Sequence, residues 1–332
     1  MRKRFTLQEY KEGVLSGDRT KLSQAITLAE SSLESDLALA SDLVQEVLPH
    51  TGKSIRIGIT GVPGVGKSTF IEAFGQLLIE AGKSVAVLAV DPSSQKSKGS
   101  ILGDKTRMEK LAGDKRAFIR PSPTGNTLGG VSSKTREAML LCEAAGFDVI
   151  LVETVGVGQS ETAVKSMVDF FLLLMLAGAG DELQGIKKGI MEMADGVVIH
   201  KADGDNQTSA KKAKSSYENA LHLFPLGENN WSTPVITASS LNGEGLMEIW
   251  EMILDFESKM LRSGFWESNR AEQRLNWLDE NLQFLLSKFF LEHQQVQKML
   301  TQNRSRVENG ELSPLALARD LISTFFHSNQ KL

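Results

Sequence analysis

Cysteine is almost absent from this chain of 332 residues, in which Cys142 is the single copy. One thiol cannot form an internal disulfide, so the sequence is typical of a reducing compartment and predicts a cytoplasmic location. We expect Cys142 to lie in a core, because apolar residues directly precede it at 139–141. The five histidines are scattered, so the chain also has few ligands for a metal such as nickel.

Long apolar runs and a strong excess of one charge are also absent. The most apolar segment, 170–177, is far too short to cross a bilayer and predicts a buried strand. The first ten residues, MRKRFTLQEY, are basic but contain no apolar stretch, so no secretory signal is predicted. A net charge of −4 argues against bulk binding to nucleic acid or to an anionic membrane. The composition predicts an ordinary soluble globular protein with neither of these partners.

The most informative stretch is 55–69, IRIGITGVPGVGKST. A β-branched run leads into G-x-x-x-x-G-K-S, the full pattern of a phosphate-binding loop. The glycines let successive backbone N–H groups point at one anion, Lys67 supplies positive charge, and the Ser68 hydroxyl can ligate Mg²⁺. A helix beginning at Lys67 would add its N-terminal dipole. The candidate nucleotide-binding residues here are Gly61, Val62, Pro63, Gly64, Val65, Gly66, Lys67, Ser68 and Thr69.

Between about residues 55 and 257 the sequence alternates strand-like and helix-like segments. This order predicts an α/β fold of three layers, the phosphate-loop NTPase fold, with a mainly parallel sheet covered on both faces. Apolar runs predict strands at 55–60, 84–90, 117–120, 148–153, 170–176, 196–200 and 234–237. The predicted parts are a helical N-terminal extension at 1–52, a nucleotide-binding domain at 53–260 and a helical C-terminal segment at 261–332. Ligands are expected beyond the carboxyl ends of the strands.

Acidic residues follow two of these strands. Asp91 ends the second strand, where its carboxylate can bind Mg²⁺ through water or orient an attacking water, although a turn-forming Asp before proline is the alternative. Asp104 is a second acid in the polar segment 95–108, whose length suggests a switch loop. Glu153 ends the fourth strand, where an acid is expected to hold Mg²⁺. Gln159 could position water, or it could be a solvated loop residue.

Residues 200–203, His-Lys-Ala-Asp, resemble the N-K-x-D pattern with which many phosphate-loop proteins select guanine. The Asp203 carboxylate can accept from guanine N1–H and the 2-amino group, and the stem of Lys201 can pack along the base. His200 replaces the usual Asn, and a neutral imidazole N–H could still donate to purine N7. The alternative is a turn and helix cap at Asp203. A base loop that could reach guanine O6 is expected at Ser239, Ser240 and Leu241.

Beyond residue 261 the strand signals stop and a helical pattern follows. Apolar residues there recur at heptad-like spacing. Such a helix either folds back on its own domain or pairs with a second copy of the chain, and we favour a homodimer. The residues of this apolar stripe are Leu275, Leu278, Leu282, Leu285 and Phe289.

These motifs together resemble those of one family. The segments GVPGVGKST, AVDPSS, GSILGDKTRM, ILVETVGVGQSE, GDELQGIKKG and KADGDN, with GDRTKLSQAITLAES near the start, are similar to the MeaB/ArgK/MMAA family of phosphate-loop GTPases over nearly the whole chain. The resemblance implies binding of GTP or GDP with Mg²⁺, and slow GTP hydrolysis that a partner accelerates. It also implies a homodimer built through the C-terminal helices. The implied partner is adenosylcobalamin-dependent methylmalonyl-CoA mutase, to which the family gates cofactor delivery and which it protects from inactivation.

The same resemblance implies roles for the residues already named. Residues 61–69 would hold the phosphates, and Asp203 would read guanine with the base loop beside it. The metal would be surrounded by Ser68, Asp91, Asp104 and Glu153. Lys187 or Lys188, in a segment expected to sense the nucleotide, or a cation from a partner could complete the site. The candidate catalytic residues are therefore Lys67, Asp91, Glu153, Gln159 and Lys188.

Three other functions stay open. A nickel-inserting GTPase would need more imidazole or thiol ligands than this chain has. A small-molecule kinase that uses ATP conflicts with the guanine-type segments after the sixth and seventh strands. A third alternative is a scaffold in which the bound nucleotide only locks the conformation and is not hydrolysed. It is less favoured, because the acids and polar loops that accompany the phosphate-binding loop favour hydrolysis. The client mutase is also open: methylmalonyl-CoA mutase is the common client of the family that the chain resembles, and the related isobutyryl-CoA mutase is the alternative.

Overall fold

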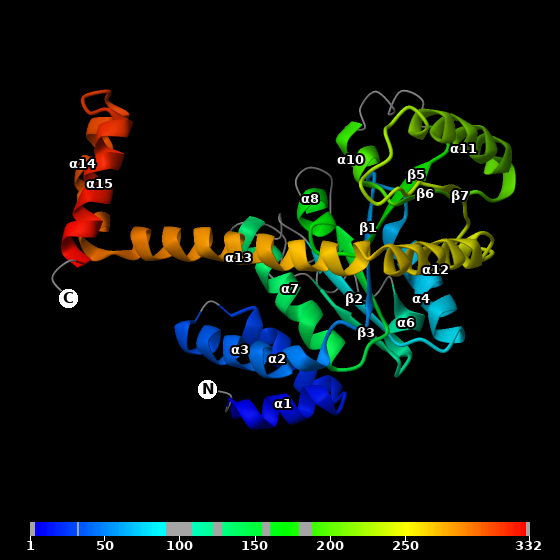
Figure 1. Cartoon of the computed structure of the whole chain (residues 1–332), viewed down its shortest axis with the longest axis horizontal. Coiled ribbons are helices and arrows are strands. Elements are labelled where there is room, and N and C mark those ends of the chain that lie inside the picture. The colour runs from blue at the N-terminus through cyan, green and yellow to red at the C-terminus, as the bar shows by residue number, and fades with distance from the viewer. Residues whose placement is uncertain are drawn as a thin grey trace. The chain divides into compact units, whose positions relative to one another are not determined.

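The protein is described here by a computed structural model (Figure 1). Internal contacts divide the chain into two units, Met1–Gln273 and Arg274–Leu332. The structure describes residues 4–31, 33–90, 108–121, 128–154, 160–178 and 188–329.

A sheet of seven parallel strands forms the centre of the first unit, in the order β3-β2-β4-β1-β5-β6-β7. All seven predicted strands are confirmed, with bounds that differ by at most one residue at either end. The phosphate-loop NTPase type of fold is confirmed as well. The strands are β1 (Ile55–Gly61), β2 (Val85–Val90), β3 (Ala117–Arg120), β4 (Val149–Thr154), β5 (Phe170–Leu176), β6 (Gly196–His200) and β7 (Val235–Thr237).

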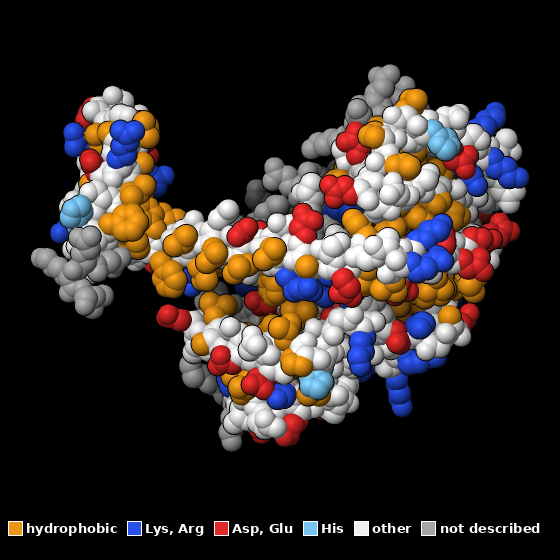
Figure 2. Space-filling view, in the orientation of Figure 1, with side chains coloured by type: hydrophobic (Ala, Val, Ile, Leu, Met, Phe, Trp, Pro, Cys, Tyr) orange, Lys and Arg blue, Asp and Glu red, His pale blue; other side chains and the backbone are white. Residues whose placement is uncertain are grey.

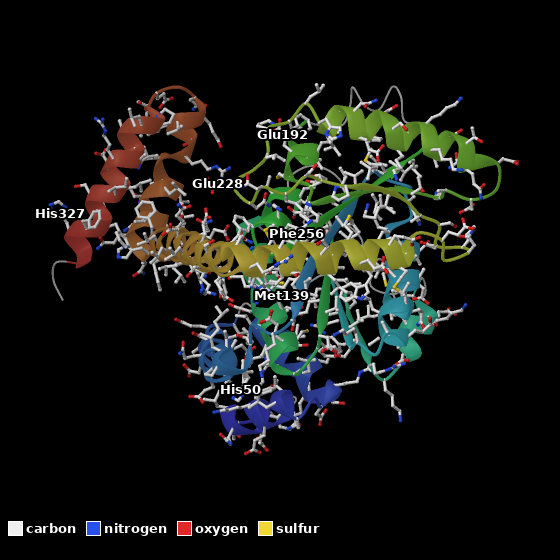
Figure 3. The ribbon with its side chains drawn as sticks, turned by 45° about the vertical axis from the view of Figure 1, so that its right-hand side comes forward. His50, Met139, Glu192, Glu228, Phe256 and His327 are labelled. Atoms are coloured by element: carbon white, nitrogen blue, oxygen red, sulfur yellow. The ribbon has the colours of Figure 1, made fainter. Side chains whose placement is uncertain are left out.

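Helices cover both faces of this sheet, which explains why its strands are continuous apolar runs rather than alternating patterns. In β2, for example, Val85 and Val87 belong to the core shared with α4 (Lys67–Glu80) and α12 (Leu246–Ser263). The neighbouring side chains of β2 belong to the opposite core, shared with α7 (Leu128–Ala144). Phe256 of α12, labelled in Figure 3, points toward the sheet. Its ring packs edge-to-face on Phe170 of β5, with ring centroids 5.0 Å apart.

The N-terminal helices extend the core on the α7 side of the sheet. Their buried side chains form one cluster with α7, β2 and β4. These helices are α1 (Leu7–Leu15), α2 (Arg19–Ala29) and α3 (Glu34–Val47). The remaining elements of the first unit are η1 (Leu48–His50), α6 (Glu109–Gly113), α8 (Ser160–Lys165), α10 (Lys188–Met193), η3 (Gly204–Asn206) and α11 (Gln207–Leu221).

Two expectations from composition can be compared with the structure. Cys142 is fully buried in the core beside α7, as predicted, and burial raises the pKa of its thiol far above the ordinary value. Within the described ranges, no helix has the length and apolar character needed to cross a membrane.

The second unit is helical and has a small core of its own. Helix α13 (Phe265–Glu292) runs across the division between the units, and α14 (Gln294–Glu308) and α15 (Pro314–Asn329) follow. The core of this unit centres on Val296, Leu317 and Leu321. Hydrophobic side chains lie at the surface of α13 (Figure 2). The exposed residues include the whole predicted stripe, Leu275, Leu278, Leu282, Leu285 and Phe289, each between 44% and 63% exposed.

A buried ion pair fixes the first part of α13 to the sheet. Arg270 is 4% exposed, and its guanidinium donates twice to the Asp169 carboxylate, at 2.7 and 2.6 Å. The same group donates to the backbone oxygens of Gly52 and Ser54 at 2.6 and 2.7 Å. Asp169 also accepts from the N–H of Arg56 in β1. All of these partners lie at the amino ends of β1 and β5.

We expect Arg270→Met to lower the free energy of unfolding by about 3–5 kcal/mol, because it leaves the buried Asp169 carboxylate without its cation. Urea titration followed by circular dichroism measures this change. A suitable control is Lys214→Met, which removes a surface pair with Glu218 at 3.8 Å and should change the unfolding free energy by about 0.5 kcal/mol or less. Equal unfolding midpoints for Arg270→Met and wild type would contradict the role given to this pair.

Candidate functional site

The phosphate-binding loop connects β1 to α4 at the carboxyl edge of the sheet. Gly61 approaches β5 so closely that a Cβ atom there would lie 2.5 Å from the backbone oxygen of Leu174. Gly66 has φ +92°, a conformation that favours glycine, and a Cβ atom there would lie 3.2 Å from Cε1 of His200. The loop therefore needs glycine at both positions, one for close approach and one for backbone conformation.

Lys67 lies at the first position of α4, where its side chain turns back over the loop. Its Nζ donates to the backbone oxygen of Gly61 at 2.9 Å. Burial lowers the pKa of Lys67, and the charges of Glu153 and Glu161 act in the opposite direction. An ammonium group has three protons, so Lys67 can keep the Gly61 bond and still donate to a phosphate oxygen.

Glu153 and Ser68 are the two predicted metal ligands whose positions the structure describes. The Ser68 hydroxyl donates to the Glu153 carboxylate at 3.2 Å, although the two residues are 85 positions apart in sequence. Glu153 is 6% exposed at the end of β4. A hydroxyl and a carboxylate are hard oxygen donors, and Mg²⁺ in nucleotide sites takes few protein ligands because phosphates and water supply the rest. These residues fit Mg²⁺.

Glu161 is a functional candidate that the sequence analysis did not single out. It is 2% exposed in α8, and its charge acts on Lys67 in the phosphate-binding loop. In the sequence it is the last residue of the family-like segment ILVETVGVGQSE, and it lies three residues before Val164, a core residue. Spacing of this kind predicts burial but does not predict which cation the acid faces.

His200 and Lys201 connect the end of β6 to the phosphate-binding loop. Nδ1 of His200 lies 2.7 Å from the Val65 backbone oxygen, and Nε2 lies 2.7 Å from the Ser240 hydroxyl. Lys201 has φ +59°, and its Nζ donates to the backbone oxygen of Gly64 at 2.8 Å. Burial lowers the pKa of His200 more than its bond to Val65 raises it. Burial therefore favours the neutral form of the ring.

Asp203 lies beside the predicted base loop. Its half-buried carboxylate accepts a hydrogen bond from the Ser239 hydroxyl, which also accepts from the N–H of Leu241 at 3.2 Å. The side chain of Asp203 makes no capping bond to η3, so a helix cap is not its role in this structure. The structure thus brings the two guanine-type segments together, with Leu241 82% exposed at the rim.

Several predicted site residues lie outside the described part of the chain. These are Asp91, Asp104 and Gln159, together with most of the segment around Lys187. Lys188 begins α10, but the position of its side chain is not described. Among the described residues, no group of three or more His, Cys, Asp and Glu side chains could hold a metal ion.

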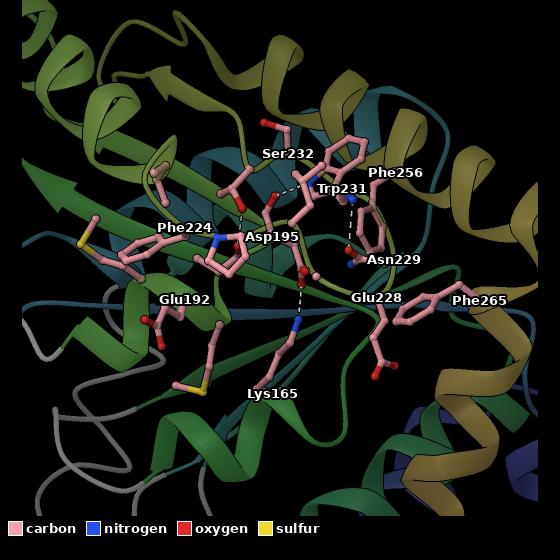
Figure 4. Close-up of a pocket in the computed structure, with 18 of the residues that line it drawn as sticks. Lys165, Glu192, Asp195, Phe224, Glu228, Asn229, Trp231, Ser232, Phe256 and Phe265 are labelled. Carbon is pink, nitrogen blue, oxygen red and sulfur yellow. Dashed lines mark hydrogen bonds and ion pairs between the residues drawn. The ribbon is translucent and has the colours of Figure 1, made fainter.

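A cavity of about 820 Å³ lies at the amino ends of β5, β6 and β7, away from the carboxyl ends at which the phosphate-binding loop lies (Figure 4). Its floor includes Asp195, whose carboxylate accepts from Lys165 at 2.5 Å and whose backbone oxygen accepts from the Trp231 indole at 2.7 Å. Phe224 and Phe256 add aromatic walls. None of the predicted site residues whose side chains the structure describes lines this cavity, and its lining lies at the amino ends of these strands, away from the phosphate-binding loop.

The family of the chain follows from comparison with known proteins. A family model described as "Methylmalonyl Co-A mutase-associated GTPase MeaB" matches residues 22–295. The chain belongs to the MeaB family. The observed loop, the Ser68–Glu153 contact and the pairing of Asp203 with Ser239 all lie inside the matched range.

Relatives of this MeaB-family chain match it over almost its full length. A putative GTPase of Caulobacter vibrioides is 51% identical, covering 94% of this chain and 95% of its own. The GTPase ArgK of Escherichia coli is 48% identical, covering 95% and 96%. The mouse protein named methylmalonic aciduria type A homolog, mitochondrial, is 46% identical, covering 95% of this chain and 78% of its own. A solved structure titled LAO/AO transport system kinase is 42% identical, with a TM-score of 0.75 and coverage of 98% and 99%.

We expect Gly66→Ala to weaken GDP binding by about tenfold or more, because an L-residue in this conformation is strained by about 1–2 kcal/mol and its methyl group would press on His200. Equilibrium binding of GDP measures the loss. Gly82→Ala is the matched control, since Gly82 has φ +81° but no atom within 4 Å of an added Cβ. That variant should lose some stability while keeping its GDP affinity. Unchanged GDP binding in Gly66→Ala would refute the steric argument.

Proposed function

We propose that this MeaB-family chain is a GTPase that binds and hydrolyses GTP with Mg²⁺. In this proposal it gates cofactor delivery to an adenosylcobalamin-dependent mutase of the methylmalonyl-CoA mutase type and protects that mutase. The observation that carries the GTPase part is the direct link between the phosphate-binding loop and the guanine-type segment. His200 and Lys201 bond to successive loop residues, Val65 and Gly64, while Asp203 two residues later faces the base loop.

Each residue of the proposed site has a chemical role. The backbone N–H groups of residues 61–69 and the Lys67 ammonium bind the phosphates, where positive charge stabilises the charge that develops on the transferred group. Ser68 and Glu153 hold Mg²⁺, which neutralises phosphate charge when it is bound. Asp91 and Asp104 complete the metal surroundings, and Gln159 or Lys188 assists the attacking water in the proposed assignment.

Guanine selection in this proposal rests on Asp203. A carboxylate accepts from guanine N1–H and from the 2-amino group, whereas adenine offers neither donor in that arrangement. Ser239 donates to the same carboxylate and so orients it. In the proposed assignment Lys201, Ser240 and Leu241 lie around the base. His200 lies between the phosphate-binding loop and the base loop.

The mutase partner is supported by the names of the family model and of one relative. The family model is described as mutase-associated, and the mouse relative is named for methylmalonic aciduria. Location in the cytoplasm is also part of the proposal; it rests on the single buried cysteine, which is typical of a reducing compartment. Cell fractionation with an antibody against the chain would test it.

The proposed activity is tested by nucleotide turnover of the purified chain with GTP and ATP, with and without a cobalamin mutase. We expect the chain to hydrolyse GTP faster than ATP. We also expect GTP hydrolysis to become faster when methylmalonyl-CoA mutase is added. Asp203→Ala should lose the preference for GTP by tenfold or more, because two hydrogen bonds to guanine are removed, each worth about 0.5–1.5 kcal/mol and more to a charged group. Released phosphate is the measured quantity.

The outcomes of this experiment separate the alternatives. Equal use of ATP and GTP by the wild type would contradict guanine selection and favour a kinase. GTP turnover that ignores methylmalonyl-CoA mutase but responds to isobutyryl-CoA mutase would change the client. Turnover that responds to neither would leave a GTPase and refute the chaperone part.

We also propose that the chain forms a homodimer through the apolar stripe of α13. Side chains as apolar as Leu282 and Leu285 rarely remain at the surface as a continuous stripe. Sedimentation equilibrium at micromolar concentration should give a dimer for the wild type and a monomer for Leu282→Glu with Leu285→Glu. Leu223→Glu is the control, because Leu223 lies in the first unit and is 84% exposed. This variant should stay dimeric. A dimer in the double variant would refute the stripe as the interface.

A further inference from the structure

The imidazole of His200 has a hydrogen-bond partner at each ring nitrogen. Nδ1 lies 2.7 Å from the Val65 backbone oxygen in the phosphate-binding loop. Nε2 lies 2.7 Å from the Ser240 hydroxyl in the base loop. The residue is 2% exposed, so water does not compete freely for these contacts. One side chain therefore spans two loops that bind different parts of the nucleotide.

The partners of the ring determine where its proton lies. A carbonyl oxygen can only accept, so Nδ1 must carry a proton to bond to Val65. Nε2 of a neutral ring then has a lone pair and no proton, and the Ser240 hydroxyl must donate to it. Burial favours this neutral form by lowering the pKa of His200.

Packing holds the ring in this orientation. The edge of Phe70 meets the ring at a centroid distance of 5.7 Å and an interplanar angle of 87°. Gly66 lies directly against Cε1, because a Cβ atom there would approach it to 3.2 Å. Rotating the ring out would break two short hydrogen bonds and these contacts together.

Purine N7 is a hydrogen-bond acceptor, so a residue that reads it must donate. The neutral His200 ring has one N–H, and that N–H is already bonded to Val65. The other nitrogen offers only a lone pair, which would repel N7 rather than bind it. This arrangement differs from the expectation drawn from the sequence pattern, in which the imidazole N–H donates to N7.

We propose that His200 is a positioning residue that joins the phosphate-binding loop to the base loop, and that the protein does not read purine N7 through it. This inference rests on the proposed binding of guanine nucleotides. Guanine selection is then left to Asp203, which reads the opposite edge of the base. A guanine nucleotide in which a C–H group replaces N7 should bind almost as well as the natural one.

The test is competition between a fluorescent GDP and either GDP or 7-deaza-GDP on the full chain with Mg²⁺. We expect the dissociation constant of 7-deaza-GDP to be within about twofold of that of GDP for the wild type. In His200→Asn the ratio should rise to about fivefold, because an Asn amide can donate to N7 and the loss of one such hydrogen bond typically changes a dissociation constant by about two- to tenfold. The ratio within each variant cancels any general loss of affinity.

Ser240→Ala is the matched control for this ratio. It removes the hydroxyl that donates to Nε2 but leaves the N–H of His200 on Val65, so the ratio should remain within about twofold. A second measurement does not depend on the GDP affinity of any variant. Imidazole ¹⁵N–¹H spectra of the GDP complex, with the His200 signal assigned as the one missing in His200→Asn, should show a proton on Nδ1 and none on Nε2.

The possible failures are distinguishable. Failure of GDP itself to compete would overturn the proposed function and this inference with it. Normal GDP binding with a wild-type ratio of fivefold or more would overturn only the inference. A proton on Nε2 in the neutral ring would do the same, because that nitrogen could then donate to N7.

Discussion

The phosphate-binding loop depends on donors that bond to its outward-facing carbonyl groups. A loop whose N–H groups converge on an anion must turn its carbonyl oxygens away, and buried carbonyls without partners are costly. Here the oxygen of Gly61 accepts from Lys67, that of Gly64 from Lys201, and that of Val65 from His200. These donors come from two distant parts of the chain, so the loop conformation requires the assembled sheet.

This arrangement explains why the loop and the base segment occur as a pair. His200 and Lys201 leave the carboxyl end of β6, two strands away from β1 in the sheet, with β5 between them. Lys201 adopts a backbone conformation that is unusual for residues other than glycine, with φ +59°. Its backbone oxygen accepts a hydrogen bond from the Asn206 side chain. Local strain at Lys201 is therefore offset by a charged donor on Gly64 and by the turn that presents Asp203.

Much of the fold was predictable from local sequence, because the relevant signals are local. The seven strands are apolar runs, since helices bury both sheet faces, and the loop has a fixed spacing of glycine, lysine and serine. The residue types at the base site were also visible in the sequence. Predictions for Asp91, Asp104 and Gln159 lie in segments outside the described residues and remain predictions.

What the sequence could not predict are contacts that depend on distant partners. The role of His200 depends on a carbonyl 135 residues earlier, since that contact decides which ring nitrogen carries the proton. Glu161 has an ordinary position on an amphipathic helix, and only the assembled site places its charge near Lys67. Arg270 similarly bonds to backbone atoms more than 200 residues away. Residue type therefore predicts which hydrogen bonds and charges a side chain can offer, whereas its partners in the fold determine which of these it uses.

The two ends of β1 show how charge is handled differently for stability and for binding. At the amino end, the Arg270–Asp169 pair is almost completely buried, so its desolvation must be offset by two direct bonds and by backbone partners on either side. At the carboxyl end, Lys67 and Ser68 are only half-buried, and Lys67 bonds to a single carbonyl. Charge that keeps part of its hydration and spare donors can bind an anion without a large rearrangement. A fully paired buried charge cannot, which is why the amino end of β1 contributes stability and the carboxyl end can contribute chemistry.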